Sequence, residues 1–235
     1  MRGPCALVPL PDGVTFDNLQ AALHALSPAP ASLLIVADDY GYSERCNDGI
    51  LDAARAGAID AASAMINRPD CVAVPLLETG IQIGLHIEEG GPAKELGSFR
   101  ALFGRDPGHL DGHHHCHAGG SLEREVTEVA RLLGIRVRAV DEAHRMRLQR
   151  AGVRCAERLI GRIHEDEPVL PAEIASLDQA GGGQGGGLQP GLTEWMVHPG
   201  YADSKLGSSY DAAREEDLAE LLRLAAAGSL AGVRA

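Results

Sequence analysis

The sequence has few aromatic residues, few basic residues and no long apolar run. Aromatic residues make up 3% of the 235 residues, so aliphatic side chains must supply most of the core. The 21 lysines and arginines are outnumbered by 33 acidic residues, and they form no cluster that would bind a phosphate backbone. No stretch of about eighteen apolar residues is present to span a bilayer. We therefore expect no nucleic-acid partner and no membrane anchor.

The sequence also lacks paired cysteine motifs. Its five cysteines are scattered, without the C-x-x-C spacing of a structural zinc or redox site. The first residues carry a single arginine and several prolines, unlike the regions of a signal peptide. We therefore expect reduced thiols in a soluble, cytoplasmic protein. Cys116 lies between His115 and His117, so a metal-ligand role is an alternative to that of a small buried residue.

The length of 235 residues suits a single α/β barrel domain. A hydrophobic content of 45% and a charged content of 23% are ordinary for a globular protein. We predict that residues 31–235 form this domain. Residues 1–30 are predicted to be an N-terminal extension, in which prolines flank a weakly amphipathic helix from Phe16 to Leu26.

The stretch from Ala31 to Gly41 predicts the central strand of the domain. Five apolar residues, Leu33 to Ala37, are followed at once by Asp38 and Asp39, which is typical of a buried strand in a parallel sheet. Adjacent carboxylates at a buried strand end repel each other and resist desolvation. They therefore need a compensating cation, a ligand or different protonation states.

Strands and helices are predicted to alternate along the rest of the chain, which indicates parallel β/α units. Further strands are predicted at residues 61–67, 81–86, 109–113, 135–140 and 192–198. Helices are predicted at residues 47–57 with Asn47 as N-cap, 69–77, 121–133 with Ser121 as N-cap, 145–163 and 210–226. The remaining segments are a predicted loop with one helical turn at residues 88–108, an ambiguous segment at 169–177 and a mobile glycine-rich loop at 181–187.

Four of the predicted strand ends carry ionisable groups. These are Asp38 with Asp39, then His86, then Asp111 with His113, and finally His198. In a parallel barrel the carboxyl ends of all strands open on one face, so these residues are expected to converge. One carboxylate and two imidazoles suit a divalent transition metal, and a second, free carboxylate suits a general base. The pattern therefore predicts metal-assisted hydrolysis of an amide or ester.

Each of these residues also has an ordinary structural interpretation. A single histidine at a strand end, such as His86, is more often hydrogen-bonded structure than a ligand. Paired aspartates after a strand often form a turn and a helix cap. Glu194 is either a partner of a histidine or a plain strand residue, and Arg214 with Glu215 fits a solvated helix face. The repetition at four strand ends favours the functional interpretation.

The same segments resemble the YdjC-like carbohydrate deacetylases, which include the chitooligosaccharide deacetylases. The resemblance spans about residues 31–225. It is carried by ADDYG with Ser43, Asn47 and Gly49, by GLH at 84–86, by HLDGHHHCH at 109–117, and by TEWMVHPGY at 193–201. Tyr210, Arg214 and Glu215 resemble the family's C-terminal helix.

The resemblance implies a distorted (β/α) TIM-like barrel, related to the polysaccharide deacetylases, that removes an acetyl group from a small N-acetylated saccharide. It implies a divalent metal, Mg²⁺ or Zn²⁺, and the donor set favours zinc. It also suggests a homodimer. By motif, the metal ligands are Asp39, His86 and His113, the catalytic base is Asp38, the acid is His198, and the substrate-binding residues are Tyr40, His115, His117 and Glu194.

The sequence departs from the family pattern in three places. Tyr40 stands where the family usually has phenylalanine. Only residues 87–112 separate His86 from His113, so a substrate-covering segment is predicted to be shortened. Residues 1–30 and the glycine tract have no counterpart. Two alternatives stay open at this point: another metal hydrolase on the same barrel, and a weakened metal-binding or sugar-binding relic.

Overall fold

The computed structural model describes residues 30–88, 90–162, 167–179, 187–206, 208 and 210–235. Its contacts divide the chain after Pro30, and Ala31–Ala235 form one compact unit. The helix predicted in residues 1–30 lies outside the described residues, as does the glycine tract apart from Gly187.

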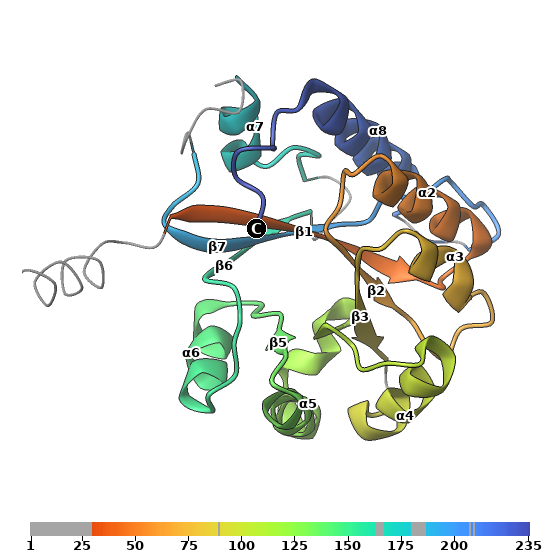
Figure 1. Ribbon diagram of the computed structural model, residues 1–235, viewed down its shortest axis with the longest axis vertical. Helices are drawn as coiled ribbons and strands as arrows, with labels where there is room; N and C mark the ends of the chain where they lie inside the picture. Colours follow the sequence, from red (N-terminus) through yellow and green to blue (C-terminus); the bar gives the residue numbers. More distant parts are fainter. Residues whose placement is uncertain (1–29, 89, 163–166, 180–186, 207, 209) are drawn as a thin grey trace, which may run out of the picture. The chain divides into compact units, whose positions relative to one another are not determined.

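Seven strands form one sheet in which all neighbouring pairs are parallel. The sheet curls into a half-barrel with helices around it (Figure 1), which confirms the predicted α/β class and the distorted TIM-like barrel. The spatial order is β5-β4-β3-β2-β1-β7-β6. The strands are β1 (Ala31–Tyr40), β2 (Ala61–Ala64), β3 (Gln82–Ile87), β4 (His109–Gly112), β5 (Arg136–Val137), β6 (Arg158–Gly161) and β7 (Gly191–Val197).

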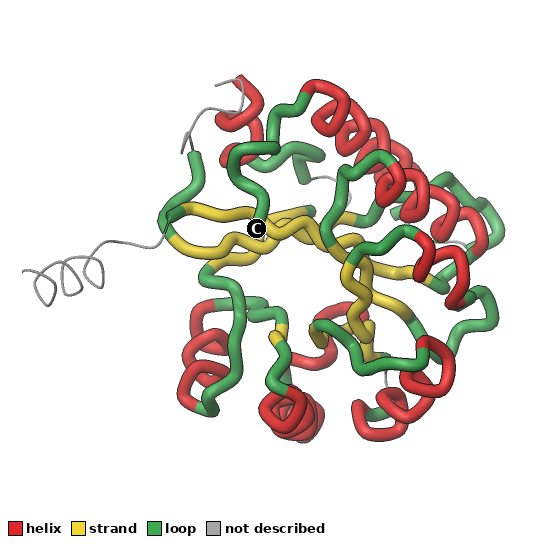
Figure 2. The backbone as a smooth tube through the Cα atoms, viewed as in Figure 1, coloured by secondary structure: helices red, strands yellow, loops and turns green. Residues whose placement is uncertain are grey.

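The predicted central strand is confirmed. β1 pairs with β2 on one side and with β7 on the other, and its last eight residues are buried. Helices lie outside the strands along the curve of the sheet (Figure 2). They are α2 (Glu44–Arg55), α3 (Ala73–Glu78), α4 (Pro92–Phe103), the 3-10 segment η1 (His113–Ala118), α5 (Gly120–Leu133), α6 (Glu142–Arg150), α7 (Ala172–Gln179) and α8 (Asp211–Ala227). None of the helices in the described part of the chain is long and apolar enough to cross a membrane.

The two predicted N-cap residues, Asn47 and Ser121, are wrong. Helix α2 begins one turn earlier than expected, because the side chain of Ser43 accepts a hydrogen bond from the backbone N–H of Cys46. Asn47 lies inside this helix, where its amide binds backbone groups of Gly41 and Asp70. Helix α5 has Gly119 at its N-cap position, with no side-chain cap.

Two longer segments also differ from the prediction. Residues 92–103 form a full helix with buried Leu96, Phe99 and Phe103, although Gly97 interrupts the helical pattern. The predicted helix 145–163 ends at Arg150, and Arg158–Gly161 is a strand instead. This strand pairs with β7 in parallel register, so tertiary pairing overrides its helical composition.

Gly84 and Gly49, two glycines of the sequence motifs, lie where another residue comes very close to the backbone. A Cβ atom on Gly84 would lie 2.2 Å from Nε2 of His109, because that ring crosses the face of β3. A Cβ atom on Gly49 would lie 2.4 Å from Cα of Gly200, so α2 and the turn after β7 meet backbone to backbone. Neither site has space for a side chain.

Candidate active site

A β-bulge at the end of β1 brings two adjacent carboxylates to one place. In a regular strand, Asp38 and Asp39 would point to opposite faces of the sheet. The register with β2 shifts between Ala37 and Tyr40, and Asp39 has a left-handed φ of 71°. Among the described residues, the other non-glycine residues with positive φ are His114 and His115. Unfavourable backbone geometry is thus concentrated around this site, as is common at functional positions.

Asp39, His86 and His113 form a compact group of potential metal ligands. One ligand atom from each lies within 4.8 Å of the other two. The Oδ1 atom of Asp39 is 3.4 Å from Nε2 of His86 and 3.1 Å from Nδ1 of His113. The three come from β1, β3 and the start of η1, so the curled sheet brings together residues that are far apart in the sequence. One carboxylate oxygen and two imidazole nitrogens form a donor set that fits zinc.

Asp111 and Ser63 orient the side chain of His86. The Nδ1 atom of His86 lies 2.8 Å from Oδ1 of Asp111, and Ser63 donates a hydrogen bond to the other oxygen of Asp111. This arrangement leaves Nε2 of His86 facing Asp39. A histidine held by a carboxylate on its far nitrogen is the usual arrangement at metal sites.

Arg138 is the centre of a buried ionic network. It lies just after β5 and is fully buried. Its guanidinium donates to both carboxylate oxygens of Asp38, at 2.5 and 2.8 Å. It also lies 3.0 Å from Oδ2 of Asp111 and donates to Glu194 over 2.5 Å. The network joins β1, β4 and β7 to the strand at the edge of the sheet.

A second group of close donor atoms consists of Asp38, His86 and Asp111. Arg138 binds both oxygens of Asp38 and one oxygen of Asp111, so it already places a cation among these carboxylates. A metal ion there would compete with a buried guanidinium. In the first group a guanidinium binds only Oδ2 of Asp39, from Arg214, and Oδ1 still faces His86 and His113. We therefore take Asp39, His86 and His113 as the metal group.

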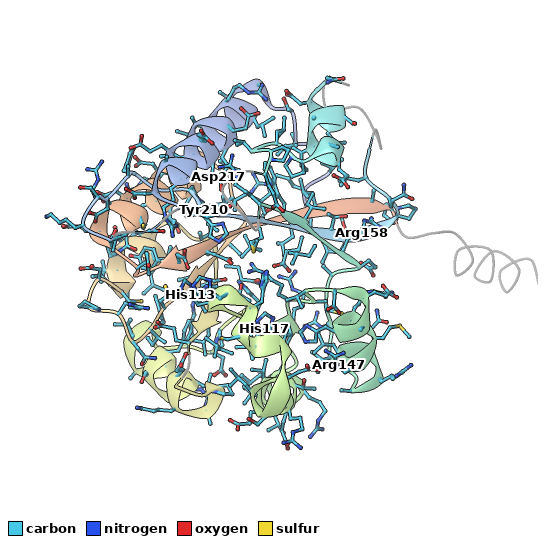
Figure 3. The ribbon with its side chains drawn as sticks, turned by 180° about the vertical axis from the view of Figure 1, so that it is seen from behind. His113, His117, Arg147, Arg158, Tyr210 and Asp217 are labelled. Carbon is cyan, nitrogen blue, oxygen red and sulfur yellow. The ribbon has the colours of Figure 1, made fainter. Side chains whose placement is uncertain are left out.

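His198 directly follows β7, and its imidazole lies near Asp38. Its Nε2 atom is 4.0 Å from Oδ2 of Asp38, and its backbone N–H donates to Oδ2 of Asp217. Tyr210 packs against the imidazole with ring centroids 4.8 Å apart. Figure 3 shows Tyr210 and Asp217 together at α8, and His113 and His117 together after β4. His198 is therefore held from its backbone and one ring face.

Burial and neighbouring groups set the pKa values of the ionisable residues in the site. Burial acts to raise the pKa of Asp39, but hydrogen bonds from His113 and His86 outweigh it and hold the pKa well below its ordinary value. Burial acts to lower the pKa of His86, but the charges of Asp111 and Asp38 raise it well above its ordinary value. Burial lowers the pKa of His198 to about 4. His198 is thus neutral at pH 7 and Asp39 is ionised.

The four residues predicted to bind substrate are placed differently from one another. Tyr40 is buried at the end of β1, where its hydroxyl donates to the backbone carbonyl of Val72. Glu194 is bound to Arg138, and Nε2 of His117 lies 3.0 Å from the carbonyl of Arg138. Tyr40 and Glu194 are thus occupied by partners within the protein, whereas Nδ1 of His117 is buried without a hydrogen-bond partner among the described residues. His115 is half-buried, and its buried Nδ1 atom has no partner among the described residues.

Several residues of the site have no role in the sequence-based prediction. Asp111 is predicted at a strand end without a function, and no motif points to Ser63. Arg138 has a signal in the sequence, since it places a charge inside a short apolar strand pattern. For Arg214 the sequence allows a solvated helix face as an ordinary alternative, but the residue is buried and donates to Asp39 over 2.7 Å. That interpretation of Arg214 is wrong.

The chain is similar in sequence and in fold to several known proteins. A family model described as YdjC-like protein matches residues 32–88 and 96–231. A carbohydrate deacetylase from Geobacillus stearothermophilus is 29% identical over 231 residues, covering 82% of this chain and 89% of that protein. A chitooligosaccharide deacetylase from Enterobacter sp. is 25% identical over 222 residues, covering 75% and 84%. A crystal structure of an Enterococcus faecalis protein shares the fold, with a TM-score of 0.66, 19% identity and coverage of 88% and 97%.

Proposed function

The chain belongs to the YdjC-like family, and from this premise we propose that it is a metal-dependent hydrolase that removes the acetyl group from a small N-acetylated saccharide. The observation that carries the proposal is the group formed by Asp39, His86 and His113, with Asp38 and His198 beside it. A group of potential metal ligands beside a second carboxylate, which is not one of them, and an imidazole is typical of a hydrolytic site.

In this proposal the metal would be held by Asp39, His86 and His113. Zinc is the preferred ion, because two of the three donors are imidazole nitrogens, whereas magnesium favours oxygen ligands. When bound, the ion supplies a Lewis acid for the amide carbonyl and lowers the pKa of an attacking water. Asp111 holds the other nitrogen of His86, Nδ1, which would leave Nε2 available to bind the ion.

Asp38 is proposed as the general base. Arg138 binds both of its oxygens, which fixes the plane of the carboxylate. Each carboxylate oxygen keeps a second lone pair, so Asp38 still has the capacity to accept a proton from water. Because Asp38 is held by Arg138 and Asp39 by Arg214, the two adjacent acids differ in partners and in proposed role.

His198 is proposed to protonate the leaving nitrogen. Because burial lowers its pKa to about 4, the imidazole is neutral in the resting site and must first gain a proton. The Oδ2 atom of Asp38 lies 4.0 Å from Nε2 of His198, so a small approach would let the proton collected by Asp38 pass to His198. The two residues would thus work in sequence on the same proton.

The test is acetate release from chitobiose-type and other N-acetyl sugars by the purified chain loaded with zinc or magnesium. We expect metal-dependent release that falls by about 10³-fold in Asp38→Asn, since a general base contributes about 10²–10⁴-fold. Asp106→Asn is a matched control, because its carboxylate is half exposed and paired with Arg100. No release from any N-acetyl sugar by the metal-loaded chain would contradict the proposal. Turnover of a phosphoester or a non-sugar amide, or sugar binding without turnover, would then identify the alternative function.

A further inference from the structure

We propose that Arg214 is a positioning residue for the metal centre, which turns Asp39 so that one oxygen faces His86 and His113. This inference rests on the metal site of the proposed function. Arg214 donates from Nη2 to Oδ2 of Asp39 at 2.7 Å. The other oxygen, Oδ1, is the one that lies near both histidines. Arg214 therefore determines which oxygen of Asp39 is left to face the two histidines.

The guanidinium of Arg214 has Asp39 as its anchor. The side chain is 3% exposed, and its Nε and Nη1 atoms have no hydrogen-bond partner among the described residues. Its carbon atom Cζ lies 5.4 Å from the ring centroid of Tyr42, in a cation–π contact. A buried cation with spare donors is held by its charged acceptor, so the ion pair constrains both residues.

Asp39 needs an external constraint because its backbone does not supply one. Its φ of 71° and the bulge in β1 remove the regular alternation that fixes side-chain direction in a strand. Without Arg214 the carboxylate would be free to rotate about χ2, or to place both oxygens toward the histidines. A rotation of this kind changes the ligand geometry without changing any ligand.

The fold delivers Arg214 to this position through two glycines. The N–H of Gly200 donates to the carbonyl of Arg214 at 3.2 Å, and a Cβ atom on Gly200 would lie 3.2 Å from Cδ of Arg214. Gly200 in turn rests against Gly49 of α2. The missing side chains let α8 approach the end of β1, although Arg214 and Asp39 are 175 residues apart. Gly200, which follows His198 and Pro199, thus leaves space for the aliphatic part of the Arg214 side chain.

Removal of Arg214 has two opposite effects on metal affinity, one through its charge and one through its orientation of Asp39. A guanidinium beside Asp39 repels a bound cation, so its removal on charge alone should tighten metal binding. Loss of an orienting partner should instead weaken binding, typically by about 10-fold to 100-fold. We infer that orientation dominates, because the ion pair is buried and the metal ligands depend on which oxygen of Asp39 is free.

The experiment measures the zinc Kd of the full chain by competition with a chromophoric chelator, with no sugar present. Arg214→Met is expected to weaken zinc binding by about 10-fold. Arg214→Lys keeps the charge but lacks the planar fork, and we expect a smaller loss of about threefold. The visible spectrum of the cobalt-loaded variants should change in band position, which a merely less stable protein would not show.

Arg162→Met is the matched control, because Arg162 is also buried against α8 but pairs with Glu216 rather than Asp39. Its zinc Kd should stay within about twofold of the wild type, the range expected when no ligand is reoriented. An unchanged or tighter zinc Kd in Arg214→Met overturns the inference. If that variant does not fold, an unchanged or tighter zinc Kd in Arg214→Lys overturns it instead. A chain that binds zinc as expected but releases no acetate would contradict the proposed function and leave this inference standing.

Discussion

The guanidinium of Arg138 binds both carboxylate oxygens of Asp38, although the two residues are 100 positions apart in the chain. Arg138 projects from the segment after β5, an outer strand of the sheet, and Asp38 lies near the end of β1, an inner strand. The described strands form no ladder between β5 and β6, so backbone hydrogen bonds do not close the barrel there. The pair therefore links the edge strand to the centre while it orients the proposed base.

Removal of the Arg138 charge should destabilise the fold as well as stop the reaction. Arg138→Gln would leave Asp38, Asp111 and Glu194 buried without their shared cation, at a cost of about 3–5 kcal/mol in the free energy of unfolding. Urea unfolding measures this loss. Arg145→Gln, which removes an ion pair with the exposed Glu142, should cost less than about 1 kcal/mol. Equal losses in the two variants would disprove the central role of Arg138.

Gly84→Ala should destabilise the protein through a clash with His109. The new Cβ atom would lie 2.2 Å from Nε2 of the ring, and overpacking of this kind costs about 1–3 kcal/mol. His109→Ala should relieve the clash, so the double variant should lose less than the sum of the single losses. Gly97→Ala is the control, because no atom lies within 4 Å of its Cβ position in α4. That change should stabilise the helix by about 0.5–1 kcal/mol.

The buried carboxyl of Asp217 should make stability depend on pH. Burial raises its pKa to about 6, above the ordinary 3.8, so folding favours the protonated form. Stability from this group is therefore present below about pH 4 and is lost as the pH rises through about 6. Asp217→Asn removes this effect, so the stability difference should shift in favour of the variant by up to about 3 kcal/mol between pH 4 and pH 7.5.

Urea unfolding at a series of pH values measures this difference. Asp178 offers a control of opposite sign, because a hydrogen bond from Arg223 lowers the pKa of its half-buried carboxyl. The stability of Asp178→Asn relative to the wild type should fall, not rise, as the pH increases from the acid range. A constant difference between Asp217→Asn and the wild type across this range would refute the assignment.

Zinc binding should stabilise the chain and release protons. Free zinc at about 100 times the Kd should add about 2.7 kcal/mol to the free energy of unfolding, which corresponds to a rise in Tm of about 5 °C. The charges of Asp111 and Asp38 keep the pKa of His86 high, so its imidazole is protonated in the metal-free protein and must lose that proton to bind a metal. Metal affinity should therefore fall as the pH decreases.

Calorimetry in two buffers of different ionisation enthalpy measures the proton release, and thermal unfolding with and without a chelator measures the stabilisation. His113→Gln should abolish both responses. His114→Gln is the neighbouring control, since its nitrogens are not among the metal group. A wild-type Tm that is unchanged by zinc and by chelator would contradict the metal site.

Tyr40→Phe should leave catalysis unchanged. The hydroxyl of Tyr40 donates to the carbonyl of Val72, away from the carboxylates of the site, so its loss should cost about 1 kcal/mol of stability. We expect kcat/KM within about twofold of the wild type, because no transition-state contact is removed. A larger fall in kcat/KM would support the sequence-based prediction that Tyr40 binds substrate.

Six of the seven strands in the described sheet, and the strand ends that carry ionisable residues, were predictable, because apolar runs and their abrupt ends are local properties of the chain. The strand at Arg158–Gly161 was not, since its residues are helical in composition and only the register with β7 makes them a strand. The helix at Pro92–Phe103 was also missed, because glycine and charge obscure its pattern and burial of Phe99 and Phe103 stabilises it.

The sequence by itself determined which residues stand at the strand ends, including Asp39, His86 and His113. Only the tertiary structure decided how they are divided into roles. A strand places neighbouring side chains on opposite faces, and the bulge at Asp39 overrides that rule. Arg138 and Arg214 then bind Asp38 and Asp39 separately, and both arginines come from distant segments. Contacts of such long range depend on the curl of the sheet, which no local pattern of residues encodes.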